Sequence, residues 1–252
     1  DGDVARVKVA DRIHIVASGR LGFGLTDDFD CHVYLVDGGD EYALIDAGGG
    51  RDSDAIVALI IGDGLDPIRV RYLLLTHGHA DHAAGAARLR QHFGLRVLAS
   101  PVVARYLREG DERAVSLDVA RKAGAYPPDF IFPPCPVDAE LDDGAQVTVG
   151  DLTLTALNTP GHASGHIAYV LRQGDRVSVF CGDAVFFGGT ILLQHTWDCS
   201  LQESIASIER LAALSVDGLF PGHLTFAVRH GRRQVEKAMQ AIANLLPPPQ
   251  LA

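Results

Sequence analysis

The sequence lacks the features that mark several common protein classes. None of its four cysteines lies in a C-x-x-C pair, so we expect small buried thiols rather than a disulfide framework. No apolar run approaches the ~20 residues that a membrane span needs, and no basic-then-apolar signal segment opens the chain. These absences favour a cytoplasmic protein, although the start at Asp1 rather than Met leaves a removed leader open. The G-x-S-x-G turn of many serine hydrolases is also missing, so no serine nucleophile of that kind is expected.

Basic residues are in the minority. Lys and Arg number 22 against 32 Asp and Glu, which gives a formal net charge of −10 and a pI near 5.5. Because nucleic-acid binding depends on basic surface, we expect no nucleic-acid partner. The apolar fraction of 47% is ordinary for a globular protein. A length of 252 residues suits a single domain over residues 1–252 with a sizeable core, and it leaves a homo-oligomer open.

The most informative segment is His77-Gly78-His79-Ala80-Asp81-His82, which follows an apolar run over residues 70–76. Two imidazoles one residue apart can bind one metal ion, and the Asp-His pair after them can bind a second, since His and Asp are common ligands of zinc-like ions. Eleven histidines could produce a single His-x-His by chance. Four ligands directly behind a predicted buried strand instead indicate a metal site.

Three more candidate ligands follow predicted strands. They are His162 in Asn158-Thr159-Pro160-Gly161-His162, Asp183 in Val179-Phe180-Cys181-Gly182-Asp183, and His223 in Leu219-Phe220-Pro221-Gly222-His223. A glycine shortly before each one permits a sharp turn back over the strand end. A loop histidine taken singly is more often only hydrogen-bonded. The same pattern at four strand ends favours a metal centre.

Hydrophobic patterns predict a similar layout in two halves of the chain. The first half has predicted strands at 31–36, 41–46, 70–75 and 95–99, with helices at 53–61 and 83–93. The second half has predicted strands at 146–149, 152–157, 167–171, 176–181 and 217–220, with helices at 201–214 and 232–246. Hairpins followed by helix–strand units in both halves predict two sheets packed face to face, with helices outside.

The segment between the halves, residues 101–136, has a different composition. Its first part, 102–122, is helical in pattern, whereas the prolines in 126–134 exclude a regular helix. Long connections of this kind are usually functional or disordered. We predict a lid over the metal site, with the alternative that the segment caps a sheet edge. As lid residues, Tyr126, Phe130 and Phe132 would line the substrate pocket.

Residues after Asp183 supply two further pocket candidates, His195 and Trp197. For Trp197, the only tryptophan, a packing role is an equally good interpretation. His166 begins a predicted strand four residues after His162, and we expect it at most to support the ligands.

The His-x-His-x-Asp-His run and the strand-end ligands resemble the metallo-β-lactamase superfamily, from the strand that ends at Asp46 to the loop at His223. The resemblance implies the metallo-β-lactamase fold, a four-layer αββα sandwich of the α/β class. It implies one metal bound by His77, His79 and His162, and another bound by Asp81, His82 and His223. Asp183 would bridge the two metals, and Asp46 would anchor the His loop without being a ligand.

The resemblance further implies a dinuclear metallohydrolase. A metal-bridging hydroxide would attack an activated acyl bond of a small ester, thioester or lactone, since a single zinc lowers the pKa of water to ~7. Asp81 would orient the hydroxide and help to move its proton. The expected cofactors are two divalent ions, zinc by default, with iron or manganese also permissible. The bridging Asp183 resembles the glyoxalase II and lactonase branch rather than the antibiotic-degrading enzymes.

Three alternatives stay open. The first alternative is a β-lactam hydrolase, and the second is a persulfide dioxygenase with one iron on His79, His162 and Asp183. The third is a non-catalytic binding protein. The filled second site argues against the dioxygenase, and the complete ligand set argues against the binding protein. The family's glutathione thioesterases usually carry a helical extension, and the residues after His223 leave room for about one helix. That difference favours a simpler acyl substrate, such as a lactone.

Overall fold

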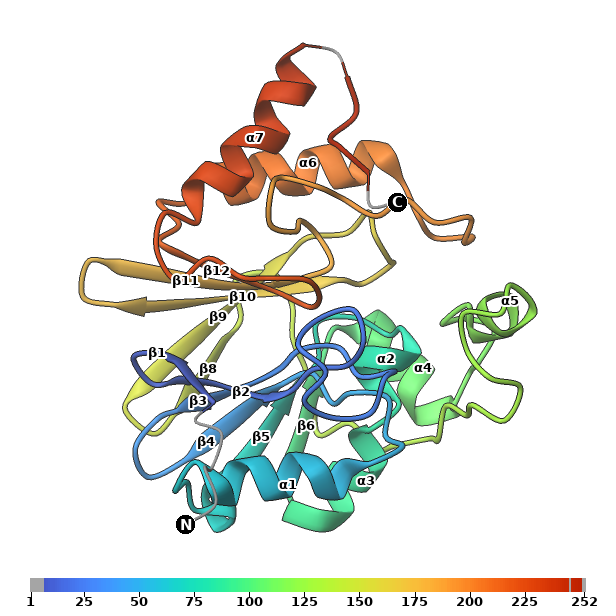
Figure 1. The fold of residues 1–252 in the computed structure, drawn as a ribbon, viewed down its shortest axis with the longest axis vertical. Coiled ribbons are helices and arrows are strands. Elements are labelled where there is room, and N and C mark those ends of the chain that lie inside the picture. The colour runs from blue at the N-terminus through green and yellow to red at the C-terminus, as the bar shows by residue number, and fades with distance from the viewer. Residues whose placement is uncertain (1–6, 245, 251–252) are drawn as a thin grey trace.

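Two β-sheets pack face to face, and helices cover the outer side of each sheet (Figure 1). The computed structural model describes residues 7–244 and 246–250. The predicted four-layer αββα arrangement of the α/β class is confirmed. Among the described helices, none is both long and apolar enough to cross a membrane.

The first sheet has seven strands in sequence order, with α1 (Ser53–Gly62) and α3 (Ala86–Phe93) on its outer face (Figure 1). Strands β1 to β4 pair in antiparallel fashion, and β4 to β7 pair in parallel. Its strands are β1 (Lys8–Ala10), β2 (Ile13–Ala17), β3 (Val33–Asp37), β4 (Tyr42–Ile45), β5 (Val70–Leu74), β6 (Arg96–Ala99) and β7 (Ala139–Glu140). A short 3-10 turn, η1 (Pro67–Arg69), leads into β5. Strands β1, β2 and β7 were not among the predicted ones.

The second sheet has five strands in the order β12-β11-β10-β9-β8, with α6 (Leu201–Ala212) and α7 (Arg232–Ala243) on its outer face (Figure 1). Only β11 and β12 pair in parallel. Its strands are β8 (Gln146–Val149), β9 (Leu152–Asn158), β10 (Ile167–Gln173), β11 (Arg176–Gly182) and β12 (Gly218–Pro221). The predicted strands of the second half are therefore all present.

Glycines break two of the predicted helices. Residues 83–93 fall into the end of a short α2 (Ala80–Ala83) and α3, because the Gly85 N–H donates to the Gly48 carbonyl oxygen at 3.0 Å instead of continuing the helix. That loop lies so close that a side chain on Gly85 would meet the Ala47 carbonyl oxygen at 2.1 Å. Residues 102–122 form α4 (Pro101–Glu109) and α5 (Leu117–Lys122), since Gly110 ends α4 in the left-handed conformation. The helix predicted for 232–246 ends at Ala243, and residue 245 lies outside the described residues.

Two buried tyrosines join the sheets near the strand ends. The Tyr169 hydroxyl on β10 donates to the Leu75 carbonyl oxygen at 2.7 Å, and the Tyr34 hydroxyl on β3 donates to the Pro221 carbonyl oxygen at 2.8 Å. Both acceptors lie two residues before a candidate ligand, His77 in the first case and His223 in the second. The inter-sheet core therefore fixes the strand ends that carry these ligands.

The buried side chain of Asp30 gives a pH-dependent test of the packing around the loop after β4. The side chain is 3% exposed, its Oδ1 accepts the Gly49 N–H at 2.7 Å, and its Oδ2 has no hydrogen-bond partner among the described residues. Burial raises the pKa of the carboxyl group to about 6. Because this folded pKa exceeds the unfolded value of about 3.9, the carboxyl group lowers the free energy of unfolding as pH rises from about 4 to about 6.

Asn cannot ionise and keeps an acceptor for Gly49. Between pH 4 and pH 7 we expect Asp30→Asn to gain about 2–3 kcal/mol in free energy of unfolding relative to wild type, as measured by urea denaturation. Asp40→Asn, in an exposed turn, should show no such gain. A difference between Asp30→Asn and wild type that does not change with pH would contradict the prediction.

Candidate metal centre

The structure brings all seven predicted ligands to one edge of the two sheets. The segment after β5 carries His77 to His82, and three further loops each supply one ligand. His162 follows β9, Asp183 follows β11, and His223 follows β12. Apart from His79 and Asp81, which are partly exposed, all of the seven are buried.

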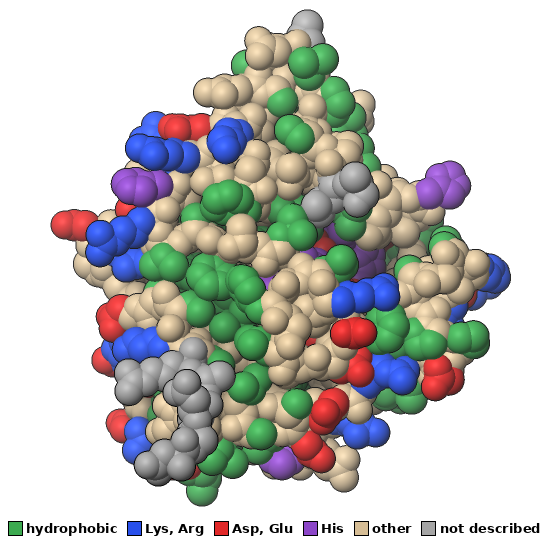
Figure 2. Space-filling view, in the orientation of Figure 1, with side chains coloured by type: hydrophobic (Ala, Val, Ile, Leu, Met, Phe, Trp, Pro, Cys, Tyr) green, Lys and Arg blue, Asp and Glu red, His purple; other side chains and the backbone are tan. Residues whose placement is uncertain are grey.

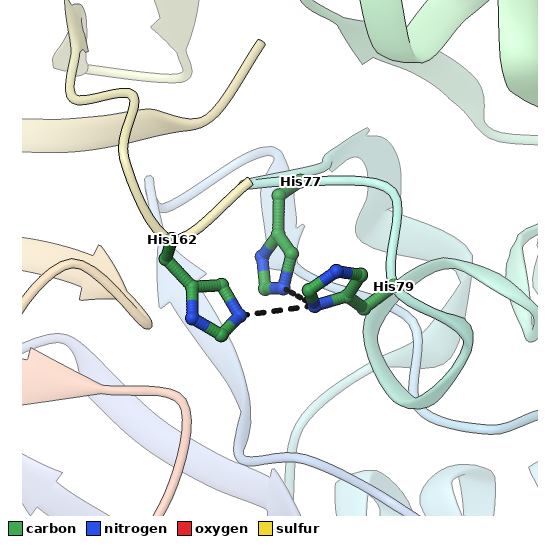
Figure 3. Close-up of side chains that lie close together, drawn as sticks. All are labelled: His77, His79 and His162. Carbon is green, nitrogen blue, oxygen red and sulfur yellow. Dashed lines mark hydrogen bonds between the residues drawn. The ribbon is translucent and has the colours of Figure 1, made fainter. Parts of the chain in front are cut away.

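Three imidazoles form the first group. The Nδ1 of His79 lies 3.1 Å from the Nε2 of His77 and 3.0 Å from the Nε2 of His162 (Figure 3). Two of these histidines come from the loop after β5 and the third from the opposite sheet. Three nitrogens from three side chains within 4.8 Å of one another form a set that one zinc-like ion can bind.

Two imidazoles and a carboxylate form the second group. The Nε2 atoms of His82 and His223 are 3.2 Å apart, and the Asp81 Oδ2 lies 3.0 Å from the His223 Nε2. The same Asp81 oxygen is 3.7 Å from the His82 Nε2. This group also has one candidate ligand atom from each of three residues within 4.8 Å.

Asp183 lies between the two groups. Its Oδ2 is 3.6 Å from the His162 Nε2 in the first group and 3.6 Å from the His223 Nε2 in the second. Its Oδ1 is 3.4 Å from the His82 Nε2. A single carboxylate therefore faces imidazoles of both groups, as a bridging ligand would.

Burial and charge act in opposite directions on these side chains. Burial is the main cause that lowers the pKa of His77 well below its ordinary value and that of His162 to about 4. Burial alone would raise the pKa of Asp183, but the imidazoles of His223 and His82 hold it well below its usual range. For His82 the surrounding thiol and carboxylates outweigh burial and raise the pKa. The centre thus combines neutral imidazoles at His77 and His162 with an ionised Asp183, whereas His82 is held toward its protonated form and must lose that proton when a metal ion binds.

Two buried polar atoms in the centre have no protein partner. The His79 Nε2 and the Asp183 Oδ1 lack a hydrogen-bond partner among the described residues. Such atoms are costly to bury unless something else binds them. The unpartnered Asp183 oxygen, together with the donor set, shows that the residues present fit metal ions. The Nε2 of His79 does not contribute to this fit, because Nδ1 is the nitrogen that faces His77 and His162.

Asp46 supports the centre from behind, where the resemblance placed it. Its Oδ2 accepts the His82 Nδ1–H at 2.9 Å, and its Oδ1 accepts the Thr76 N–H at 2.7 Å. The residue has φ of 65°, an unusual conformation for a residue with a side chain. An imidazole whose other nitrogen is held in this way presents a fixed orientation to a metal ion.

His166 performs a similar function for Asp183. Its ring lies 5.0 Å from the His77 ring in a stacked arrangement, and its Nε2 accepts the Asp183 N–H at 3.1 Å. The Nδ1 lies 2.9 Å from the Thr159 Oγ1, so Nδ1 carries the proton and the ring is neutral. Burial, the main cause, lowers the pKa of His166 to about 3, which keeps this acceptor available.

A cavity of about 460 Å³ opens beside the ligands. Tyr126 and His195 line it, as predicted, and the Tyr126 hydroxyl donates to the Asp81 Oδ1 at 2.8 Å. The structure does not bring Phe130 or Phe132 into this cavity. Both are buried, and Phe130 packs against Tyr126 and Phe29 with ring centroids 4.6 and 5.7 Å away.

Trp197 also lies outside the cavity. It is 64% exposed, and its indole N–H donates to the Ala114 carbonyl oxygen at 3.1 Å. The cavity walls instead include α5 and the loop around Leu21 and Phe29, which sequence reasoning missed. The available signal was the presence of Val115, Leu117 and Val119 within the segment predicted as a lid.

A family model described as the metallo-β-lactamase superfamily matches residues 26–223. The chain belongs to this superfamily. The matched region contains all seven candidate ligands, so the predicted family and fold are confirmed.

Curated relatives of the chain include proteins named hydroxyacylglutathione hydrolase and acyl-coenzyme A thioesterase. A hydroxyacylglutathione hydrolase of Anaeromyxobacter dehalogenans is 32% identical over 199 residues, which are 77% of this chain and 61% of the relative. Hydroxyacylglutathione hydrolase GloC of Haemophilus influenzae is 30% identical over 147 residues, 58% of this chain and 62% of the relative. An acyl-coenzyme A thioesterase, MBLAC2, of Gallus gallus is 31% identical over 208 residues, 76% and 72% of the two chains. The chain thus spans about three fifths of the length of the two hydroxyacylglutathione hydrolases.

Solved structures support the fold. A metallo-β-lactamase of Cronobacter sakazakii with a HARLDQ motif has a TM-score of 0.67 at 24% identity, over 94% of this chain and 85% of that one. The metallo-β-lactamase MIM-2 has a TM-score of 0.67 at 22% identity, over 95% and 93%. At this level of identity the likeness extends to the fold alone.

Asp46→Asn tests the support of the centre. Asn tolerates a positive φ, but its amide cannot accept hydrogen bonds from both His82 and Thr76. We expect metal affinity, measured by competition with a chromogenic chelator, to fall about 10- to 100-fold while the fold is kept. Asp143→Asn, which alters an exposed ion pair with Arg210, is the matched control. Wild-type metal affinity in Asp46→Asn would show that the aspartate does not orient His82.

Proposed function

We propose that the chain is a dinuclear metallohydrolase that cleaves an activated acyl bond, and that the bond is a thioester in preference to an ester or a lactone. The observation that carries the proposal is the place of Asp183, within 3.6 Å of imidazoles from both ligand groups. The relatives named for thioester hydrolysis support the choice of bond.

His77, His79 and His162 would hold one ion, and Asp81, His82 and His223 the other, with Asp183 shared. Two bound divalent ions would supply a Lewis acid for the acyl carbonyl and a water of lowered pKa. Zinc is the metal that this donor set favours.

Asp81 is the residue that we assign to proton transfer. Its Oδ2 faces His223, and its Oδ1 accepts the Tyr126 hydroxyl, so both oxygens are held at the edge of the cavity. There Asp81 would orient the attacking water and accept its proton. As the water oxygen adds to the acyl carbon and the carbon–sulfur bond breaks, that proton would pass to the leaving thiolate.

Metal content tests the two-ion arrangement. We expect fully loaded wild type to bind close to two transition ions, measured by inductively coupled plasma mass spectrometry, and a strong chelator to abolish thioester hydrolysis. Asp183→Ala removes a side chain that faces both groups, so the content of both ions should fall together. A single tightly bound iron in wild type, with oxidation of a persulfide, would instead favour the dioxygenase.

Asp81→Asn tests proton transfer. At matched metal loading we expect kcat for a thioester to fall about 10²- to 10⁴-fold, with a much smaller change in KM, because the lost group acts on the water and not on the bound acyl group. Asp143→Asn, in an exposed ion pair with Arg210 outside the cavity, serves as the control. Wild-type turnover in fully loaded Asp81→Asn would exclude this role. A preference for β-lactams over thioesters in the same assay would overturn the proposed bond type.

A further inference from the structure

One wall of the cavity beside the metal centre is a segment that the two sheets do not contain. We call residues 115–126, which include α5, the α5 wall. In Figure 1 α5 projects from the body of the molecule, and Figure 2 shows histidine side chains at the bottom of a hollow next to it. The residues of the α5 wall that line the cavity are Val115, Ser116, Leu117, Val119, Ala120, Ala123, Ala125 and Tyr126.

The helix of this wall has two chemically different faces. Val119, Ala120 and Ala123 line the cavity, and Val119 is 43% exposed there. The charged side chains form ion pairs instead, Arg121 with Glu112 and Lys122 with Asp118. Because burial of apolar surface is favourable, an apolar face that remains open beside the ligands is a place for an apolar group to bind.

Two hydrogen bonds to the wall itself and one to Ala114, the residue before it, hold the wall in place. The Arg20 guanidinium donates to the Ala125 carbonyl oxygen at 3.3 Å, and the Trp197 indole N–H donates to the Ala114 carbonyl oxygen at 3.1 Å. The Tyr126 hydroxyl donates to Asp81 itself. The apolar face therefore has a defined position relative to the residue that we assign to proton transfer.

Apolar side chains from other parts of the chain line the same cavity. They are Leu21, Phe29, Phe186, Leu192 and Leu224, beside the polar residues Asp28, Asp30, Gln194 and Thr196. Apart from Arg20, no Lys or Arg is among the described residues that line the cavity, so a peptide with several carboxylates would find little to pair with. The walls suit a hydrocarbon group better than a small hydroxylated one.

We infer that the cavity binds the acyl part of the substrate, and that this part is an extended apolar group whose length is selected by Val119, Ala120 and Ala123. The inference rests on the proposed acyl-bond hydrolysis and names its substrate class. The observation behind the inference is that one cavity joins these three residues to the metal centre. Its lining also includes His79, Asp81, Asp183 and His223.

Binding of carboxylate products tests the wall directly. We would titrate the zinc-loaded full chain with straight-chain carboxylates from acetate to decanoate by isothermal calorimetry. The carboxylate group is constant across the series, so differences report the chain. We expect affinity to rise roughly fourfold for each added methylene until the cavity is filled. Affinity that is independent of chain length would overturn the inference.

Two wall variants and one control complete the test. Ala120→Leu fills part of the cavity, so decanoate affinity should fall at least tenfold while acetate affinity stays the same. Val119→Asp places a charge on the apolar face and should weaken every long chain. Lys122→Leu, on the charged face of the same helix, should bind the series as wild type does. Equal effects of Ala120→Leu and Lys122→Leu would overturn the inference.

Thioester hydrolysis separates this inference from the proposed function. We would measure kcat/KM for N-acetylcysteamine thioesters of the same acyl groups in wild type and Ala120→Leu. A preference for long chains that shifts toward short chains in the variant supports both. If all thioesters are hydrolysed and Ala120→Leu leaves the order of kcat/KM across the acyl groups unchanged, the proposed hydrolysis stands and the role of the wall is overturned. Chain-length-dependent carboxylate binding without any hydrolysis overturns the function and supports the wall as the binding surface.

Discussion

The carboxylate of Asp183 between two groups of imidazoles is the contact on which the rest of the centre depends. A buried carboxylate is costly unless cations or hydrogen bonds compensate for its lost hydration. Here the facing imidazoles of His223 and His82 hold it ionised, and the hydrogen bond from the Asp183 N–H to His166 fixes the backbone that carries it. Two sheets must meet correctly for this to happen, because His82 and Asp183 come from opposite sheets. The hydrogen bonds of Tyr34 and Tyr169 between the sheets secure that geometry at the same edge.

The insertion between the halves forms part of the cavity beside this centre. Its helix α5 presents small apolar side chains to the cavity, and its next residues bring the Tyr126 hydroxyl to Asp81. One segment thus contributes both a surface for a substrate and a contact to a candidate catalytic side chain. The ring of Phe130 packs against Tyr126, and Phe132 is buried in the core, so both contribute packing. Substrate selection and the stability of the segment are therefore assigned to different residues of the same insertion.

Most of the regular structure could be predicted because its signals are local. Alternating apolar residues and glycine turns gave the strands of the second half, and the ligand motif followed a strand where it was expected. The breaks at Gly85 and Gly110 were missed for a physical reason. The first depends on the hydrogen bond from the Gly85 N–H to the Gly48 carbonyl oxygen of a distant loop, and the second on a left-handed residue that a helical pattern does not reveal.

The amino-acid sequence by itself determined the family, the layout of the two halves and the identity of the candidate ligands, because metal-binding side chains must be present in the chain at a spacing that a loop can bring together. Only the tertiary structure decided which of these side chains face one another, and that α5 rather than Phe130 and Phe132 lines the cavity. Apolar residues have the same pattern in a core and in an open pocket wall. What distinguishes the two is whether another part of the chain covers them, and that depends on how distant segments pack.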